Sequence, residues 1–279
     1  MKLEILAEIA QSVGTPTYVY DANVTIQQYK KLHQAFSPLN VKLHYALKAL
    51  NNVNILRLLK REGAGLDAVS IQEIHLGMRA GFDPTKIMYT PNCVSFEEIQ
   101  EAVDLGVHIN LDNLSMLEKF GSTYVDSVPI CIRLNPHIMA GGNANISVGH
   151  IDSKFGISIH QLRHICRIVE HYNMSVIGLH MHTGRDIIDP DVFIRGAELL
   201  YEAAELFPNL RFLDFGSGFK ISYKESDLVT EIEIIGKKIA ASFQAFCERA
   251  HRDLELWFEP GKFIVSEAEK LLVTTNVVK

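Results

Sequence analysis

Short apolar runs alternate with longer amphipathic stretches along most of the chain. The runs typical of buried strands are residues 41–47, 66–69, 87–89, 108–111, 129–134, 176–182, 212–215 and 254–258. The stretches between them with helical periodicity are 54–61, 71–80, 96–105, 114–120, 159–171, 190–206 and 231–251. Strands that alternate regularly with helices predict a parallel sheet covered by helices.

Eight such strands predict a (β/α)8 TIM-type barrel over residues 26–265. A chain of this length suits the fold, since such barrels typically need about 250 residues. An open doubly wound sheet is the alternative. It requires a switch point in the strand order, and the sequence offers no position for one.

Both ends of the chain lie outside this barrel. A helix over 3–13 and a strand over 17–20 precede it, and an apolar strand over 271–278, without an evident partner, follows it. These ends predict strands of a second, β-rich domain that this sequence does not complete. We therefore expect residues 1–25 to belong to that β domain, 26–265 to form the barrel, and 266–279 to begin a truncated C-terminal β domain.

The composition is that of an ordinary globular protein, with 47% hydrophobic and 22% charged residues and a net charge of −6. No basic stripe is present, so nucleic acid is not an expected partner. No segment has membrane-spanning length, and the beginning does not resemble a signal peptide. The four cysteines lack metal or redox spacing, which favours reduced thiols and a cytoplasmic location.

A barrel gathers the ends of all its strands at one rim, so distant residues can share a site there. Lys48 stands at the tip of the first strand, where it and Ala46 would share a face. It is either a surface lysine that caps the strand or an amine inside a cavity. In a cavity, desolvation would lower its pKa and allow it to form a Schiff base with an aldehyde.

Other strand ends carry groups that also have two interpretations. Asp67 lies in the second strand. Glu259 is either a surface carboxylate or the partner of a protonated ring nitrogen. His182 stands where a flat ring could stack on a flat cofactor, whereas His180 is expected to be a packed core residue. The two histidines could also ligate a metal, but no third ligand is evident, so no metal is predicted.

Two neighbouring turns favour a phosphate site. Gly216, Ser217 and Gly218 follow the seventh strand, and Pro260-Gly261-Lys262 follow the eighth. Glycines let backbone N–H groups converge on an anion, and barrels often bind phosphate after strands seven and eight. A lysine, a phosphate site and a buried acid are together what pyridoxal 5'-phosphate requires.

The order of motifs also carries a resemblance. The motifs are Tyr-Ala-Leu-Lys-Ala (45–49), Gly-Leu-Asp-Ala-Val-Ser (65–70), Arg-Leu-Asn-Pro (133–136), Ser-Lys-Phe-Gly-Ile (153–157), His-Met-His-Thr-Gly (180–184), Gly-Ser-Gly-Phe (216–219) and Glu-Pro-Gly-Lys (259–262). In this order they resemble the diaminopimelate decarboxylases, which belong with ornithine and arginine decarboxylases to the fold-type III pyridoxal-phosphate family. The resemblance covers essentially the whole chain.

The resemblance implies a role for each candidate residue. Lys48 would hold the cofactor, Glu259 would pair with its ring nitrogen, and His182 would stack on the ring; these three are the expected catalytic residues. The phosphate would lie among backbone groups of both turns, and Asp67 would support the lysine. The implied cofactor-binding residues are Lys48, Asp67, His182, Gly216, Ser217, Gly218, Glu259, Pro260, Gly261 and Lys262.

The implied activity is decarboxylation of meso-2,6-diaminopimelate to L-lysine, a step of lysine biosynthesis, in a homodimer. Several positions depart from the family pattern: Arg185 replaces a serine, Lys262 replaces an arginine, and Glu269-Lys270 replaces a glycine followed by an apolar or aromatic residue. The family's further domain, with its substrate-binding residues and proton-donating cysteine, is not in this sequence, so we expect this chain alone to be inactive or nearly so. A non-catalytic cofactor-binding fragment and a decarboxylase of another basic amino acid (ornithine, arginine or lysine) stay open as alternatives. A single-barrel racemase-like protein would lack the two terminal strands.

Overall fold

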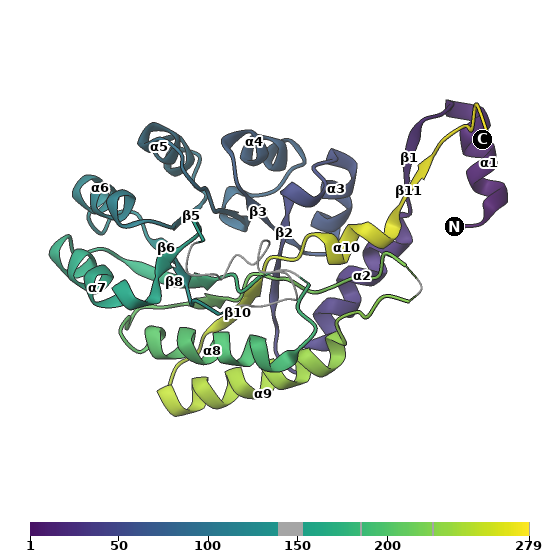
Figure 1. The fold of residues 1–279 in the computed structure, drawn as a ribbon. Helices are drawn as coiled ribbons and strands as arrows, with labels where there is room; N and C mark the ends of the chain where they lie inside the picture. Colours follow the sequence, from purple (N-terminus) through teal and green to yellow (C-terminus); the bar gives the residue numbers. More distant parts are fainter. Residues whose placement is uncertain (139–152, 185, 225, 279) are drawn as a thin grey trace.

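The computed structural model describes residues 1–138, 153–184, 186–224 and 226–278, and its centre is a closed barrel of parallel strands (Figure 1). The strand order around the barrel is β2-β3-β4-β5-β6-β8-β9-β10, and β10 pairs with β2 to close the ring. The short β7 adds to β6. The predicted TIM-type barrel is therefore confirmed, and an open sheet is excluded because β5 also pairs with β6.

Strands and helices follow one another as the hydrophobic pattern predicts. The strands are β1 (Thr17–Tyr20), β2 (Lys42–Ala46), β3 (Gly65–Ala68), β4 (Ile87–Tyr89), β5 (His108–Leu111), β6 (Ile130–Asn135), β7 (Ile157–Ser158), β8 (Val176–Met181), β9 (Phe212–Asp214), β10 (Glu255–Phe258) and β11 (Glu269–Leu272). The helices are α1 (Leu3–Val13), α2 (Ala22–Ala35), α3 (Val53–Arg61), α4 (Ile71–Arg79), α5 (Phe96–Asp104), α6 (Leu114–Tyr124), α7 (Leu162–His171), α8 (Pro190–Ala204), α9 (Ile232–Ala250) and α10 (Lys262–Val265). Each of the eight barrel strands begins and ends within one residue of its predicted bounds.

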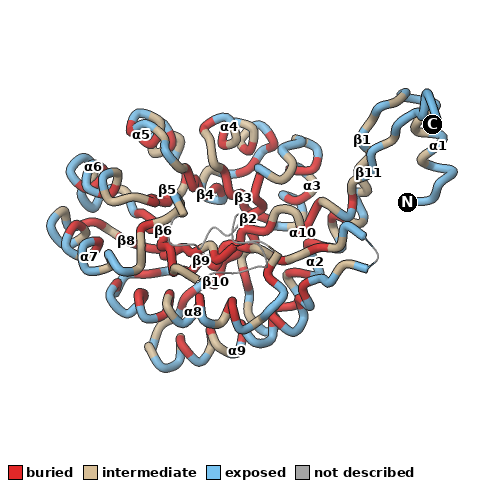
Figure 2. The backbone as a smooth tube through the Cα atoms, in the orientation of Figure 1, coloured by how far each residue is buried: buried red, intermediate tan, exposed pale blue. Residues whose placement is uncertain are grey.

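The barrel strands are buried on both faces (Figure 2). Outside the ring, apolar side chains of the strands pack against the inner faces of the helices as one large core. Inside the ring, a smaller apolar cluster comprises Met88, Cys131, Ile177, Phe212 and Trp257. The interior of the ring is therefore filled by side chains, which leaves its rim as the place for a ligand within the barrel.

Side-chain caps begin several helices soon after the strand that precedes them. Ser70 accepts a hydrogen bond from the Glu73 N–H at the start of α4, and the Glu73 carboxylate accepts one from the Val69 N–H. Asn113 accepts a bond from Met116 N–H in the same way at the start of α6. Such caps end the strand and turn the chain outward, which leaves the strand ends exposed at the rim.

The two chain ends form an arm beside the barrel, in which β1 and β11 pair antiparallel and α1 lies at the outer end (Figure 1). The predicted strand over 271–278 is placed wrongly: it lies at Glu269–Leu272, and its partner is β1. That the arm belongs to a second domain, with divisions after residues 25 and 265, stays a prediction. No helix in the described part of the chain is long and apolar enough to cross a membrane.

Candidate functional site

A cavity of about 240 Å³ opens where several barrel strands end. Its walls come from segments that follow β2, β8, β9 and β10, which lie far apart in the sequence. The lining residues are Ala46, Lys48, Ala49, His182, Asp186, Ser217, Gly218, Phe219, Glu259, Gly261, Lys262 and Phe263. The rim of the barrel thus brings together most of the residues that the sequence singled out.

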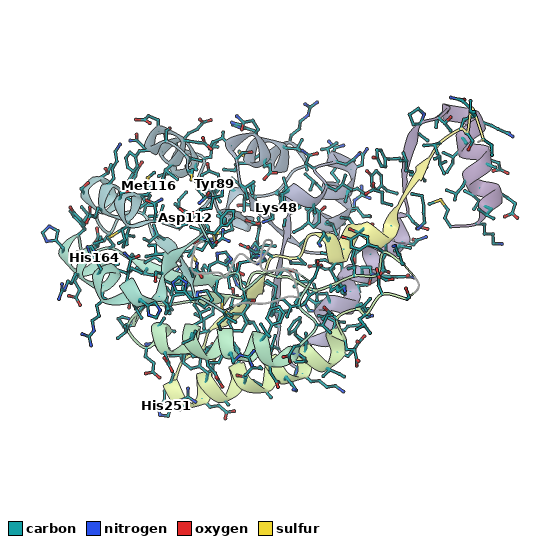
Figure 3. The ribbon with its side chains drawn as sticks, viewed as in Figure 1. Lys48, Tyr89, Asp112, Met116, His164 and His251 are labelled. Atoms are coloured by element: carbon teal, nitrogen blue, oxygen red, sulfur yellow. The ribbon has the colours of Figure 1, made fainter. Side chains whose placement is uncertain are left out.

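Lys48 reaches the cavity from a turn and not from a strand. β2 ends at Ala46, and residues Leu47–Ala49 form one turn of 3-10 helix. The Tyr45 hydroxyl donates to the Leu50 carbonyl (3.0 Å) and holds this turn in place. The prediction that Lys48 extends the alternation of the strand is therefore wrong, although Ala46 and Lys48 both line the cavity. Figure 3 shows Lys48 inward of the peripheral His164 and His251.

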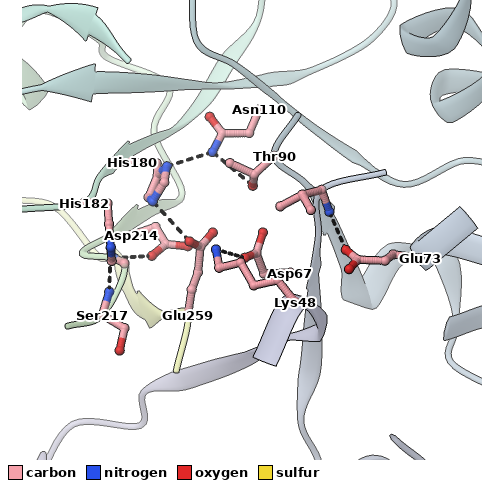
Figure 4. Close-up of polar contacts among 12 residues, drawn as sticks. Lys48, Asp67, Glu73, Thr90, Asn110, His180, His182, Asp214, Ser217 and Glu259 are labelled. Atoms are coloured by element: carbon pink, nitrogen blue, oxygen red, sulfur yellow. Dashed lines mark hydrogen bonds and ion pairs between the residues drawn. The ribbon is translucent and has the colours of Figure 1, made fainter. Parts of the chain in front are cut away.

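The amine of Lys48 lies 3.3 Å from the Oδ2 atom of Asp67, whose side chain is fully buried (Figure 4). The Asp67 carboxylate raises the pKa of the Lys48 amine, and this effect outweighs desolvation, which lowers it. The predicted lowering of the lysine pKa is therefore wrong. The physical reason is the ion pair, together with a side chain that stays 58% exposed.

Glu259 follows β10 and is 6% exposed. Its Oε2 atom lies 3.2 Å from Nε2 of His180, and its Oε1 atom has no hydrogen-bond partner among the described residues. Burial raises the pKa of Glu259, but His180, Lys48 and Arg133 together lower it well below the usual range. The site therefore holds an ionised carboxylate with one oxygen free to bind a ligand.

His182 follows β8, and its Nδ1 atom accepts a hydrogen bond from the Ser217 N–H (3.2 Å). Burial lowers the pKa of His182 well below its usual value, and the charges of Arg133 and Lys48 lower it further. The imidazole is therefore neutral at pH 7 and carries its hydrogen on Nε2. A neutral ring suits a flat contact with a ligand ring.

The turn after β9 requires glycine at two positions. Gly216 and Gly218 have φ angles of +62° and +129°. A Cβ atom at 216 would lie 2.6 Å from Nδ1 of His182, and one at 218 would collide with the Gly184 carbonyl oxygen. Their backbone can therefore approach the cavity more closely than any side-chain-bearing residue would allow.

The turn after β10 closes the other side of the cavity. The Pro260 carbonyl accepts a hydrogen bond from the Ala46 N–H (3.1 Å), which ties this turn to the end of β2. A Cβ atom at Gly261 would lie 2.9 Å from that of Ala49. Pro260 itself does not line the cavity, so its contribution is to hold the turn.

The amine of Lys262 pairs with a carboxylate that the sequence analysis did not consider. Its Nζ atom lies 3.2 Å from Oδ1 of Asp186, and both side chains line the cavity. The neighbouring Arg185, which departs from the family pattern, lies outside the described residues, as do residues 139–152. An anion in this cavity would therefore compete with Asp186 for Lys262.

His180 and Asp214 are the residues whose part in the site sequence reasoning missed. His180 is buried, as expected, but it also contacts Glu259. Its ligand atom lies within 4.8 Å of those of Asp214 and Glu259. No local pattern marks this group, because it forms only where β8, β9 and β10 lie side by side.

Comparisons with known proteins agree with this geometry. The family model described as the pyridoxal binding domain of pyridoxal-dependent decarboxylases matches residues 23–266. The chain is 34% identical to the diaminopimelate decarboxylase of Methanothermobacter thermautotrophicus, over 98% of this chain and 65% of the relative. It is 32% identical to that of Staphylococcus aureus, over 98% of this chain and 67% of the relative.

Solved structures give the same result. The crystal structure of diaminopimelate decarboxylase from Helicobacter pylori complexed with L-lysine matches with a TM-score of 0.86 and 29% identity, over 95% of this chain and 68% of that one. The lysine/ornithine decarboxylase complexed with putrescine from Vibrio vulnificus matches with a TM-score of 0.81 and 27% identity, over 95% and 68%. The chain thus spans about two thirds of the length of the relatives that it matches.

Proposed function

Because the chain belongs to the family of pyridoxal-dependent decarboxylases, we propose that its cavity holds pyridoxal 5'-phosphate and serves the decarboxylation of meso-2,6-diaminopimelate to L-lysine. One observation carries the proposal. A single cavity is lined by a lysine, by a buried carboxylate with a free oxygen and by a glycine turn. These are the three kinds of group that this cofactor requires.

Each chemical group of the cofactor has a matching residue in the cavity. Lys48 would bind its aldehyde carbon, and the free Oε1 of buried Glu259 would hold a proton at its ring nitrogen. Backbone groups of the turn Gly216–Gly218, whose two glycines have no room for a Cβ atom, would receive the phosphate together with Lys262. His182 would cover one face of the ring. We propose these roles for the residues that the sequence analysis named.

The cofactor and the side chains of the protein would have different tasks in the reaction. When bound, the cofactor supplies a sink for the electron pair that the departing carboxyl group leaves behind. Glu259, whose pKa is lowered, would stabilise the protonated ring as a carboxylate, and His182, whose pKa is lowered, would add no charge beside it. The Lys48 amine must lose its proton before it can act as a nucleophile, and the adjacent Asp67 opposes that loss.

The ion pair with Asp67 gives the attachment step a pH dependence. Since Asp67 raises the pKa of Lys48, the amine is charged at neutral pH. Below that pKa, each increase of one pH unit raises the neutral, reactive fraction of the amine about tenfold. Asp67→Asn is expected to move the pH profile of cofactor attachment to lower pH and to speed attachment at pH 7. Stopped-flow absorbance between pH 6 and about 9 measures this. An unshifted profile would show that Asp67 does not control the amine.

Asp186 is expected to weaken the binding of the cofactor phosphate, because it already pairs with Lys262. Asp186→Asn should therefore tighten binding of pyridoxal phosphate about two- to fivefold, the size expected for a half-exposed ion pair. Binding of pyridoxal, which lacks the phosphate, should not change. Fluorescence titrations with both compounds measure the effect, and an equal change for both would contradict the assignment of Lys262 to the phosphate.

The identity of the substrate is a separate part of the proposal, since several basic amino acids share the same backbone groups. Two relatives at least 30% identical are diaminopimelate decarboxylases, which supports meso-2,6-diaminopimelate. The similarity to a lysine/ornithine decarboxylase supports a second candidate, decarboxylation of another basic amino acid. We further propose that the 279-residue chain alone has little or no activity, because no cysteine lines the cavity as described and it spans about two thirds of its relatives.

Mass spectrometry of reaction products tests both the proposed substrate and the proposed inactivity of the chain alone. The 279-residue chain and any longer product of the same reading frame are each incubated with pyridoxal phosphate and with meso-2,6-diaminopimelate, ornithine, arginine or lysine. We expect lysine from diaminopimelate with the longer product and a background level with the chain alone. Diamines from the other amino acids would favour the second candidate, and rapid lysine formation by the chain alone would contradict its proposed inactivity.

The assembly and location of the protein are also proposals. The resemblance to the family supports a homodimer, which light scattering of the purified protein tests. The four cysteines are free, which supports a reducing compartment such as the cytoplasm.

A further inference from the structure

Glu259 is contacted from inside the barrel by side chains that do not line the cavity. His180 of β8 and Asn110 of β5 are 1% and 0% exposed, and Asp214 at the end of β9 is 0% exposed. Nε2 of His180 lies 3.2 Å from Oε2 of Glu259, and Nδ1 of His180 lies 2.9 Å from the Asn110 amide nitrogen (Figure 4). We call Asn110, His180 and Asp214 the inner cluster.

The contacts of His180 give its ring one orientation. The Asn110 amide nitrogen donates to Nδ1 of His180, and it also lies 3.4 Å from the Thr90 hydroxyl. The Nε2 atom of His180 faces Glu259 at ion-pair distance, without meeting the geometry of a hydrogen bond. The ring is thus held by Asn110 at one nitrogen and lies against the carboxylate with the other.

Asp214, at the end of β9, lies beside His180 and Glu259. Its Oδ1 atom accepts a hydrogen bond from the Gly216 N–H (2.8 Å), and its other oxygen has no hydrogen-bond partner among the described residues. Burial raises the pKa of Asp214 well above its usual value, and the charge of Glu259 raises it further. The pKa of Asp214 is thus shifted upward, whereas His180 shifts that of Glu259 downward.

We infer that His180 is a positioning residue, which holds Oε2 of Glu259 from inside the barrel and so directs Oε1 into the cavity towards the cofactor ring. Asn110 fixes the ring of His180 through its other nitrogen. This inference rests on the proposed function. A histidine that only fills the core would give the same burial but would not act through Glu259.

A double-mutant cycle separates these two roles. Dissociation constants for pyridoxal phosphate are measured by fluorescence titration for His180→Phe, Glu259→Gln and the double variant. We expect His180→Phe to weaken binding at least about tenfold in the wild-type background and less than about twofold beside Glu259→Gln. His180→Gln, which keeps an N–H donor, should restore most of the loss. An equal loss in both backgrounds, or no loss, would overturn the inference.

Two further variants keep the test independent of folding defects. His44→Phe is the matched control, because His44 is also buried in the barrel, where its ring packs at a tilt against Trp257 (centroids 4.2 Å apart). It should bind like the wild type, and a loss equal to that of His180→Phe would overturn the inference. Asn110→Leu, which frees the ring of His180, should weaken binding only where Glu259 is present, so it decides the matter if His180→Phe does not fold. A wild-type chain that does not bind pyridoxal phosphate at all would instead contradict the proposed function.

Discussion

Lys48→Ala is expected to abolish the visible absorption band that pyridoxal phosphate forms with the chain. The alanine has no amine, so the aldehyde of the cofactor has no attachment point, while the phosphate turn and Glu259 remain. Binding should therefore persist in a weaker, non-covalent form. An absorbance titration of the wild type and of the variant measures both quantities, the band and the affinity.

Lys262→Ala is the matched control for this experiment, because Lys262 is the other lysine in the lining of the cavity. It should keep the visible band and bind the cofactor less tightly, since it loses a charge near the phosphate. A band that survives in Lys48→Ala and disappears in Lys262→Ala would mean that the cofactor is attached to Lys262 and not to Lys48.

Gly218→Ala is expected to weaken the binding of pyridoxal phosphate about a hundredfold or more. The added Cβ atom collides with the Gly184 carbonyl at a φ of +129°, so the turn must move and its N–H groups leave the phosphate. Hydrogen bonds to a charged group contribute about 1.5 to 3 kcal/mol each, and losing two gives an effect of this size. Calorimetric titration measures the affinity.

The control for this variant is Gly63→Ala. Gly63 also has a positive φ (+93°), but an added Cβ atom there meets nothing within 4 Å. It should cost about 1 kcal/mol of folding free energy through backbone strain and leave cofactor binding unchanged. Equal binding losses in the two variants would mean that general destabilisation, and not the phosphate turn, explains the effect of Gly218→Ala.

The barrel could be predicted because its information is local. A parallel strand is buried on both faces and reads as a short apolar run, as β8 (Val176–Met181) does, and each run is followed by an amphipathic helix. The ends of some strands were also predictable, since capping residues such as Ser70 and Asn113 mark where the next helix begins. The rim residues follow from the fold, because Lys48, His182 and Glu259 each come within two residues of the end of a strand.

What the sequence could not predict depends on contacts between distant segments. The pKa of Lys48 is set by Asp67, and the predicted direction was wrong because the ion pair was not considered. The inner cluster and the pair of Asp186 with Lys262 arise only when separate strand ends meet. The pairing of β1 with β11 joins the two ends of the chain and leaves no local pattern.

The most direct test of the central claim is to find which lysine bears the cofactor. The chain is loaded with pyridoxal phosphate, reduced with borohydride, digested and analysed by mass spectrometry. The account predicts that the reduced cofactor is found on the peptide with Lys48 and not on the peptide with Lys262. Modification of Lys262, of a lysine outside the cavity, or of no lysine would contradict it.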